Sequence, residues 1–266
     1  MPSTHTLPTD DALPVASTTP GSTHQLQHQH EVHEDHRLRE TWPIHRRQAL
    51  QLLLGWAVLT AVWVGLGKLI TGPLGDSALV HNDQRLAIWM ADHRTPTWNH
   101  LTVLGSYLAE TITKVLVTAV LALVLLKVWK RWFESAVLVV SLVIEAAAFI
   151  TVTEIVGRHR PDVPRLDGSP VGSSFPSGHT AAAAAYVAIA IVVFWHTRTM
   201  WVRALVAIVA ALIPVIVALS RMYRGMHFLT DTIAGALLGL AAVALTAVVL
   251  QRSPEGTRAR ELSGAS

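Results

Sequence analysis

Long apolar blocks dominate the chain between about residues 48 and 250. Six of them can be separated, and each is about as long as a helix that crosses the roughly 30 Å hydrocarbon core of a bilayer. They lie at about 48–70, 108–128, 134–156, 180–196, 201–220 and 231–250. Strands of a transmembrane barrel alternate apolar and polar residues, whereas these blocks do not. The pattern therefore predicts an all-α integral membrane bundle of six transmembrane helices.

Polar zones flank the predicted membrane domain at 47–250. Residues 1–46 contain a segment rich in Thr, Pro and Ser followed by a His-rich tract, which is typical of a disordered tail. The histidines of the tract lack a compact ligand frame, so we expect a solvated tail and no metal site there. Residues 251–266 are expected to form a short polar C-terminal tail.

The segment at about 71–107, between the first two blocks, is polar enough to face water. Apolar residues recur in it at helix-like intervals around Leu86–Met90. This pattern fits an amphipathic helix on the outer membrane surface, where it would line a lipid entry route. An ordinary ordered loop fits it equally well.

Composition supports the membrane prediction and excludes other classes. The chain is 51% hydrophobic and 15% charged, whereas soluble domains carry about 25% charged residues. It has no cysteine, which excludes disulfides and thiolate metal sites. The net charge of +3 is modest, and the basic residues flank the apolar blocks. Nucleic acid is therefore not an expected partner, whereas membrane lipids are.

The placement of Lys and Arg predicts an orientation in the cell membrane. With a cytoplasmic N-terminus, the inner segments carry more of these residues than the outer segments, as the positive-inside rule requires. The outer arginines gather in two short segments, 158–165 and 221–224. We expect this local excess of positive charge to mark an extracytoplasmic active site.

Both arginine-rich segments continue into a histidine. The first runs from Gly157 to Pro161 and the chain then reaches Pro176–His179, where the fourth block begins. The second runs from Ser220 to His227, with Asp231 four residues further on. Because the helices alternate in direction, these segments share one membrane face. The arginines and histidines are therefore expected to form one pocket for an anion and for acid–base chemistry.

Several of these residues suit a phosphate group. Guanidinium groups bind its oxygens well, and the best candidates are Arg160 and Arg221, with Arg158 and Arg224 as support. Ser177 and Gly178 begin a predicted helix, where a hydroxyl and free backbone N–H groups provide a second anion cradle.

Three further residues suit phosphoryl transfer. His227 and Asp231 are spaced i, i+4, so the carboxylate can fix one imidazole nitrogen and leave the other free to attack phosphorus. His179, from the other segment, can protonate the departing alcohol and later activate water.

The motifs Arg160-Pro161, Pro176–His179 and Ser220–Asp231 resemble those of the type 2 phosphatidic acid phosphatase family. That family shares its active-site frame with vanadium haloperoxidases and bacterial acid phosphatases. The resemblance implies a six-helix membrane fold, a phosphohistidine intermediate and no metal or other cofactor for hydrolysis. It assigns His227 as nucleophile, Asp231 as its orienting carboxylate, His179 as general acid and base, and Arg160, Arg221, Ser177 and Gly178 as phosphate ligands.

One position departs from the family pattern. The family has a lysine seven residues before the arginine of Arg160-Pro161, and here that position is Thr153. Threonine offers one hydrogen bond but no charge, which weakens phosphate binding or changes substrate choice. Arg158 is the candidate to compensate.

Charged residues and glycines inside the predicted spans also need an explanation. Glu110 and Lys114 are spaced i, i+4 and are expected to pair with each other. Glu145 lies in the middle of the third span, and the sequence identifies no partner for it. Gly235 and Gly239 are expected to allow close packing between neighbouring helices.

The sequence thus predicts a membrane phosphohydrolase for a lipid phosphate or an isoprenyl diphosphate. Phosphatidic acid, phosphatidylglycerol phosphate and polyprenyl diphosphates all fit, so the enzyme would be of the phosphatidic acid phosphatase or the undecaprenyl-diphosphatase-like type. A non-catalytic lipid-phosphate binder or flippase with the same pocket is one alternative. A vanadate-dependent haloperoxidase is a second, and the membrane spans and Thr153 disfavour it.

Overall fold

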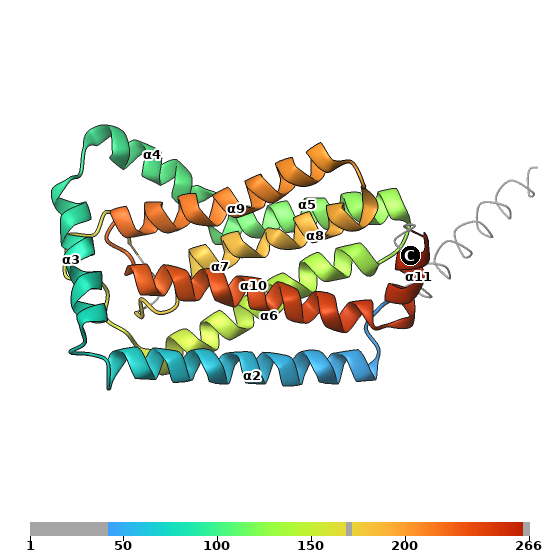
Figure 1. The fold of residues 1–266 in the computed structure, drawn as a ribbon, viewed down its shortest axis with the longest axis horizontal. Helices are drawn as coiled ribbons and strands as arrows, with labels where there is room; N and C mark the ends of the chain where they lie inside the picture. Colours follow the sequence, from blue (N-terminus) through green and yellow to red (C-terminus); the bar gives the residue numbers. More distant parts are fainter. Residues whose placement is uncertain (1–41, 169–171, 263–266) are drawn as a thin grey trace, which may run out of the picture. The chain divides into compact units, whose positions relative to one another are not determined.

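The computed structural model describes residues 42–168 and 172–262. The predicted N-terminal tail therefore lies almost entirely outside the described residues. Six stretches of the described chain are long and apolar enough to cross a membrane. They are α2 (Arg46–Thr71), α5 (Thr111–Trp129), α6 (Phe133–Val156), α7 (Gly178–Ala185) with α8 (Val187–His196), α9 (Met200–Tyr223) and α10 (Leu229–Gln251). The prediction of an all-helical bundle with six membrane spans is confirmed (Figure 1).

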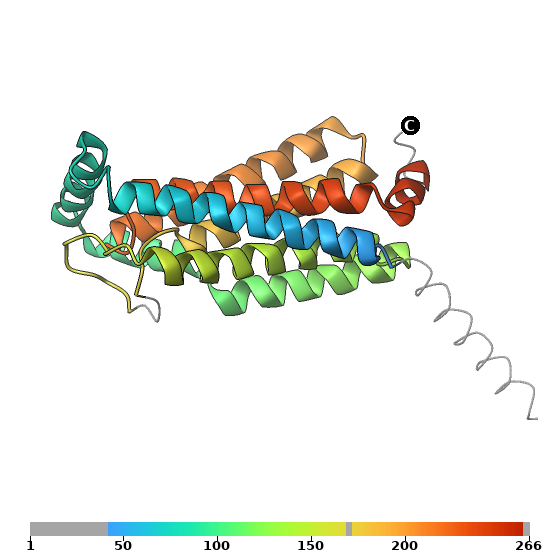
Figure 2. The ribbon, with the colours of Figure 1, turned by 90° about the horizontal axis from the view of Figure 1, so that it is seen from below.

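The helix α10 lies at the centre of this bundle. Its most extensive contacts are with α7, followed by α6 and α2 (Figures 1 and 2). Buried apolar side chains such as Val137, Leu238 and Val243 fill the space between these helices. The indole nitrogen of Trp63 on α2 donates a 2.9 Å hydrogen bond to the carbonyl of Ala234 on α10. In contrast, α5 buries none of its residues and packs on α6 at the edge, which leaves its apolar surface for lipid.

Two glycines let α10 approach α7 closely, as the sequence predicted. A Cβ atom at Gly235 would lie 2.3 Å from the carbonyl oxygen of Ser177, and one at Gly239 would lie 2.2 Å from that of Ala181. Any side chain larger than hydrogen would therefore push the helices apart. This contact matters for function because Ser177 and α10 both contribute to the site described below.

Two helices cross the end of the bundle that carries the site. They are α3 (Ala78–Asp92) and α4 (Pro96–Tyr107), and α3 runs across the ends of the spanning helices (Figure 1). Each begins at a hydroxyl cap, because Ser77 accepts from Val80 N and Thr95 accepts from Trp98 N. For the segment at 71–107, the sequence allowed either a helix or an ordered loop. The structure has a helix there, α3, and a second helix, α4.

The opposite end of the bundle carries a further short helix. Residues Pro254–Leu262 form α11, within the segment that the sequence assigns to a polar tail. His45 Nε2 lies 3.1 Å from Glu255 Oε1 and so links α11 to the start of α2.

Candidate active site

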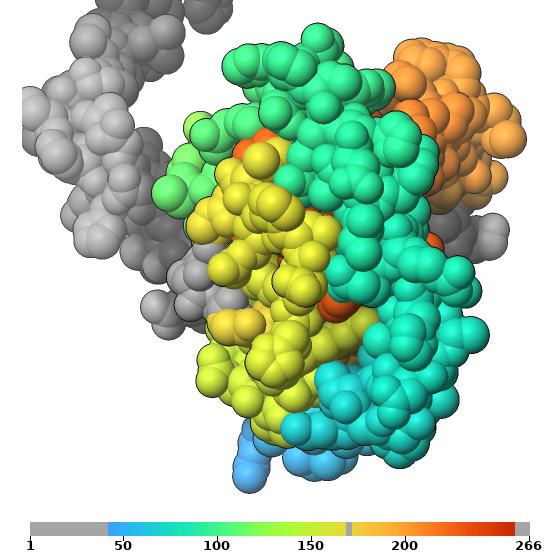
Figure 3. Space-filling model, turned by 90° about the vertical axis from the view of Figure 1, so that its left-hand side faces the viewer, coloured from blue at the N-terminus to red at the C-terminus, as the bar shows by residue number. Residues whose placement is uncertain are grey.

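Three segments far apart in the sequence meet at the end of the bundle covered by α3 and α4. They are the loop that follows α6, the start of α7 and the turn between α9 and α10. Backbone hydrogen bonds join them: Ser174 N donates to Arg158 O at 2.8 Å, and Ser177 N donates to Asp231 O at 2.9 Å. Figure 3 views this end, where α3, α4 and the loop after α6 cover the orange-red part of the chain.

The turn between α9 and α10 depends on Gly225. Its φ of +74° lies in the left-handed region, which side chains other than hydrogen adopt only with strain. Its N–H donates to Met222 O at 2.9 Å, and Met226 N donates to Arg221 O at 3.0 Å. The chain thereby leaves α9 abruptly, which puts His227 on the same side as the arginine that precedes the turn.

His227 is held in a defined tautomer. Its Nδ1 lies 2.7 Å from the carbonyl oxygen of Ser174, and a carbonyl can only accept. The proton is therefore on Nδ1, and Nε2 keeps the lone pair of a nucleophile. Burial, followed by the positive charges of Arg160 and Arg221, holds the pKa of His227 well below its ordinary value. The imidazole is consequently neutral at neutral pH.

The role expected for Asp231 differs from the one the structure shows. Its Oδ2 lies 3.9 Å from His227 Nδ1, which is too far for a hydrogen bond. That oxygen instead accepts from Phe228 N at 2.9 Å. The partner of His227 is thus the backbone of Ser174, which no sequence motif indicates because every residue carries a carbonyl. Asp231 shapes the start of α10 and adds negative charge near the imidazole.

Arg158 does not compensate for the threonine at 153. Its Nη1 lies 2.5 Å from Asp231 Oδ1, its Nη2 lies 3.2 Å from Asp83 Oδ2, and its guanidinium stacks 4.2 Å from the centre of the Phe228 ring. The guanidinium group of Arg158 is therefore already engaged by two carboxylates and an aromatic ring. Asp83 lies on α3, and no local pattern in the sequence connects it with this site.

Thr153 itself is buried, and within the described chain its hydroxyl has no hydrogen-bond partner.

Arg160 and Arg221 lie near His227, as predicted. Their charges act on each other and on the imidazole. Arg160 Nη2 donates to Ser173 O at 3.1 Å, and its Nη1 donates to Met226 O. Burial, followed by the charge of Arg221, lowers the pKa of Arg160, yet arginine remains charged in proteins. The two guanidinium groups therefore place concentrated positive charge beside the imidazole of His227.

A carboxylate that the motif analysis did not single out lies on these arginines. Asp167, in the loop after α6, accepts from Arg221 Nη1 at 2.8 Å and from Arg224 Nε at 2.6 Å, while its second oxygen accepts from Arg224 Nη2. Burial would raise the pKa of Asp167, but the hydrogen bond from Arg224 and the charges of both arginines lower it below its ordinary value. Asp167 is therefore ionised at neutral pH.

The start of α7 contributes the remaining predicted residues. The Ser177 hydroxyl accepts from Thr180 N at 3.4 Å and so caps the helix. A Cβ at Gly178 would lie 2.7 Å from the Phe149 ring, so the glycine permits close packing at this point. His179 follows in the first turn, and the charge of Arg221 acts on its ring. These three residues therefore bring the positive end of α7 and a second imidazole to the arginine cluster.

The predicted pairing of Glu110 with Lys114 was wrong. Lys114 Nζ lies 3.5 Å from Glu145 Oε2 on α6, and Glu145 is fully buried. Glu110 instead occupies the N-cap position of α5. The packing of α5 on α6 removes Glu145 from water, and a buried carboxylate requires a cation far more than an exposed one does. This contact supplies the partner for Glu145 that the sequence did not identify.

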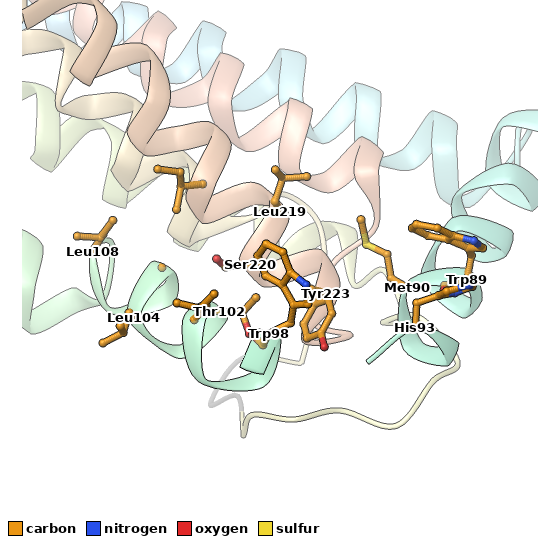
Figure 4. A pocket seen from close by; sticks show the side chains of 13 residues that line it. Trp89, Met90, His93, Trp98, Thr102, Leu104, Leu108, Leu219, Ser220 and Tyr223 are labelled. Atoms are coloured by element: carbon orange, nitrogen blue, oxygen red, sulfur yellow. The ribbon is translucent and has the colours of Figure 1, made fainter. Parts of the chain in front are cut away.

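An apolar groove of about 680 Å³ opens beside the arginines. Its lining includes Trp98 and Leu104 on α4 and Leu219 and Tyr223 on α9 (Figure 4). Thr102, also in the lining, accepts from Arg224 Nη1 at 3.3 Å. The groove therefore adjoins Arg224.

Comparison with known proteins agrees with this arrangement. Phosphatidylglycerophosphatase B of Bacillus subtilis (strain 168) is 41% identical over 90 residues, which are 33% of this chain and 43% of that protein. The chain thus matches less than half the length of this relative.

Two solved structures are similar to this chain. The crystal structure of the first transmembrane PAP2-type phosphatidylglycerolphosphate phosphatase, from Bacillus subtilis, is 25% identical with a TM-score of 0.61, over 74% of this chain and 92% of that one. Aquifex aeolicus LpxE is 24% identical with a TM-score of 0.46, over 61% of this chain and 92% of that one.

The family model of the PAP2 superfamily matches residues 134–255, which include Arg160, Ser177, His179, Arg221, His227 and Asp231. This match and the fold shared with the Bacillus structure agree with the family resemblance that the motifs around Arg160, His179 and His227 carry.

Proposed function

We propose that the protein is a membrane phosphohydrolase that removes the phosphate of a lipid phosphate, with His227 as nucleophile. The observation that carries this proposal is the arrangement around His227. Its Nδ1 donates to Ser174 O at 2.7 Å, so Nε2 is unprotonated, and the charges of Arg160 and Arg221 act on the same ring. A neutral imidazole beside two guanidinium groups suits attack on a phosphorus atom whose oxygens the arginines neutralise.

The first step transfers the phosphoryl group to the protein. Nε2 of His227 attacks phosphorus, the bond between phosphorus and the lipid oxygen breaks, and a phosphohistidine forms. His179, protonated when the negative charge of the bound phosphate offsets that of Arg221, gives a proton to the departing lipid oxygen, which leaves as an alcohol. The arginines stabilise the charge that builds up on the non-bridging phosphate oxygens.

The second step releases inorganic phosphate. His179, now neutral, takes a proton from water while the water oxygen attacks phosphorus. The bond between Nε2 and phosphorus breaks, so His227 returns to its starting tautomer and His179 to its protonated form. Every atom in this cycle comes from the lipid phosphate, water or the two imidazoles, so the two steps balance.

The apolar groove supports a lipid rather than a soluble substrate. It starts at the Thr102–Arg224 contact and is lined mainly by apolar side chains of α4 and α9. A phosphate held by the arginines would therefore place an attached hydrocarbon chain in this groove. The Bacillus relatives carry the name of phosphatidylglycerophosphate phosphatases, which makes phosphatidylglycerol phosphate the first substrate to test.

Purified full-length protein tests the proposal when it is reconstituted in lipid vesicles with phosphatidylglycerol phosphate, phosphatidic acid or an isoprenyl diphosphate. We expect the wild type to release inorganic phosphate from at least one of them and His227→Ala to release none above background. His81→Ala, at an exposed position on α3, is the matched control and should retain wild-type turnover.

The outcome also separates the alternatives. Binding of the lipids without phosphate release by the wild type would favour a non-catalytic binder and contradict the phosphohydrolase. Halide oxidation that requires vanadate and peroxide, and that His227→Ala abolishes, would instead favour a haloperoxidase.

A further inference from the structure

Asp167 occupies the position at which an anion would bind. Its two carboxylate oxygens accept hydrogen bonds from Arg221 and Arg224, with nitrogen–oxygen distances of 2.8 Å and 2.6 Å for the two contacts to Oδ2. Carboxylates and phosphates engage the guanidinium fork through the same geometry. The carboxylate therefore satisfies the donors that a phosphate would use.

The surroundings hold Asp167 in this position. Leu166 N donates to Arg224 O at 3.1 Å, and Arg94 Nη1 donates to Pro164 O at 2.7 Å. The first bond attaches the loop to the end of α9, and the second attaches it to the connection between α3 and α4. The Asp167 side chain is 25% exposed, whereas that of Arg221 is 7% exposed. The carboxylate thus lies between the arginine and solvent.

Of the described residues, the acidic ones near His227 other than Asp167 form no ion pair with Arg221 or Arg224. Asp231 and Asp83 form ion pairs with Arg158 rather than with Arg221 or Arg224. Within the described chain, Asp167 is the carboxylate that forms ion pairs with Arg221 and Arg224. Any phosphate that binds these arginines must therefore displace it or share the guanidinium groups with it.

We propose that the Asp167 carboxylate is an internal competitor of phosphate, which sets how tightly Arg221 and Arg224 hold the substrate and the released product. A phosphate monoester carries a charge of about −1.5 to −2 near pH 7, so it can displace a singly charged carboxylate. The competition weakens binding of every phosphate, and it thereby promotes release of inorganic phosphate after each turnover. This inference rests on the proposed function for its role in turnover, but the competition itself concerns binding alone.

The test measures binding of inorganic phosphate to full-length Asp167→Asn and wild-type protein in detergent, by calorimetry and by the shift in Tm. Asparagine keeps the size of the side chain and removes its charge. We expect Asp167→Asn to bind phosphate about tenfold more tightly, because a charge-assisted hydrogen bond is worth at least the 1.4 kcal/mol that corresponds to this factor. Asp162→Asn, an exposed position in the same loop, is the matched control and should leave binding unchanged.

If Asp167 had only a positioning role, Asp167→Asn would bind phosphate more weakly instead of more tightly. If the carboxylate only held Arg221 and Arg224 in place, its removal would loosen them and weaken phosphate binding. Weaker or unchanged binding in Asp167→Asn would therefore overturn the inference, provided that the unliganded variant elutes and melts as a folded protein. Asp167→Ala serves as the second variant where asparagine fails to fold, with the same expected direction.

Turnover assays separate this inference from the proposed function. In an active enzyme, Asp167→Asn should lower the KM for lipid phosphate and the inhibition constant for inorganic phosphate together. If the variant binds inorganic phosphate more tightly but neither protein hydrolyses any lipid phosphate, the competitor role stands and the phosphohydrolase fails. If lipid phosphate is hydrolysed and the variant binds phosphate no more tightly, the competitor role fails alone.

Discussion

Single charges around His227 control the protonation state of the proposed nucleophile. The imidazole is buried, and Arg160 and Arg221 both act on it. Each factor disfavours the charged imidazolium, which is why the pKa of His227 lies well below its ordinary value. The same arginines that would bind phosphate therefore keep the nucleophile unprotonated.

This coupling predicts the pH dependence of the reaction. Protonation of His227 removes its lone pair, so the activity that depends on this imidazole is lost as pH falls through the lowered pKa. We expect the acid limb of kcat/KM that belongs to His227 to lie below the ordinary histidine value of about 6.5. Replacing Arg160 with Gln removes one repelling charge, so the pKa of His227 and the acid limb should move up towards neutral pH.

The pH profile of kcat/KM, measured from about pH 4 to 9 in vesicles, checks this expectation. Arg85→Gln on α3 is the control, because its guanidinium bonds to exposed Asn82 and should leave the limb in place. An unshifted acid limb in Arg160→Gln would mean that Arg160 does not control the protonation of the nucleophile.

At the scale of helices, close packing of α10 on α7 positions the two segments that carry the proposed catalytic residues. The backbone N–H of Ser177 donates to the carbonyl of Asp231 at 2.9 Å, and this bond requires the missing side chain of Gly235 one turn further along α10. The spacing between the two helices therefore determines how far the start of α7 lies from His227.

Gly235→Ala tests this relation. Its added Cβ would lie 2.3 Å from Ser177 O, so the helices must separate or the carbonyl must shift. We expect a loss of about 1–3 kcal/mol in stability, as for other overpacked interiors, together with a several-fold fall in kcat. The Tm in detergent and the rate of phosphate release measure the two effects.

Gly65→Ala is the matched control for that substitution. A Cβ at Gly65 on α2 has no neighbour within 4 Å, so alanine should raise stability slightly through its higher helix propensity. Equal behaviour of the two variants would show that the α7–α10 spacing does not limit stability or catalysis.

At the scale of the described domain, the site and the α8–α9 connection lie at opposite ends of the bundle (Figure 1). The six spans make it a multi-pass membrane protein, and we propose that the end with the site faces outward. The arginines near the site run against the positive-inside rule, and an anion site explains why they are there.

The absence of cysteine makes this orientation directly measurable. We expect Gly168→Cys, at an exposed position in the loop after α6, to react with a membrane-impermeant maleimide on intact cells. Thr199→Cys, exposed at the start of α9, should react only after the membrane is permeabilised. The reverse pattern would place the active site in the cytoplasm.

The sequence by itself determined the six spans of the protein and the arginines and histidines at its site. Runs of about 20 apolar residues leave a helix as the main way to satisfy the backbone in lipid, so all six spans could be predicted. Alternation of helix direction then placed Arg160, His179, Arg221 and His227 at one end, where the structure has them.

Only the tertiary structure decided which charged groups pair. A buried charge takes the nearest partner in space, so Lys114 binds Glu145 rather than Glu110, and Arg158 lies between Asp231 and Asp83. A backbone carbonyl has no sequence signal at all, which is why the contact of Ser174 with His227 could not be predicted. The same reason applies to Asp167, whose role depends on how a loop folds back onto two arginines more than fifty residues away.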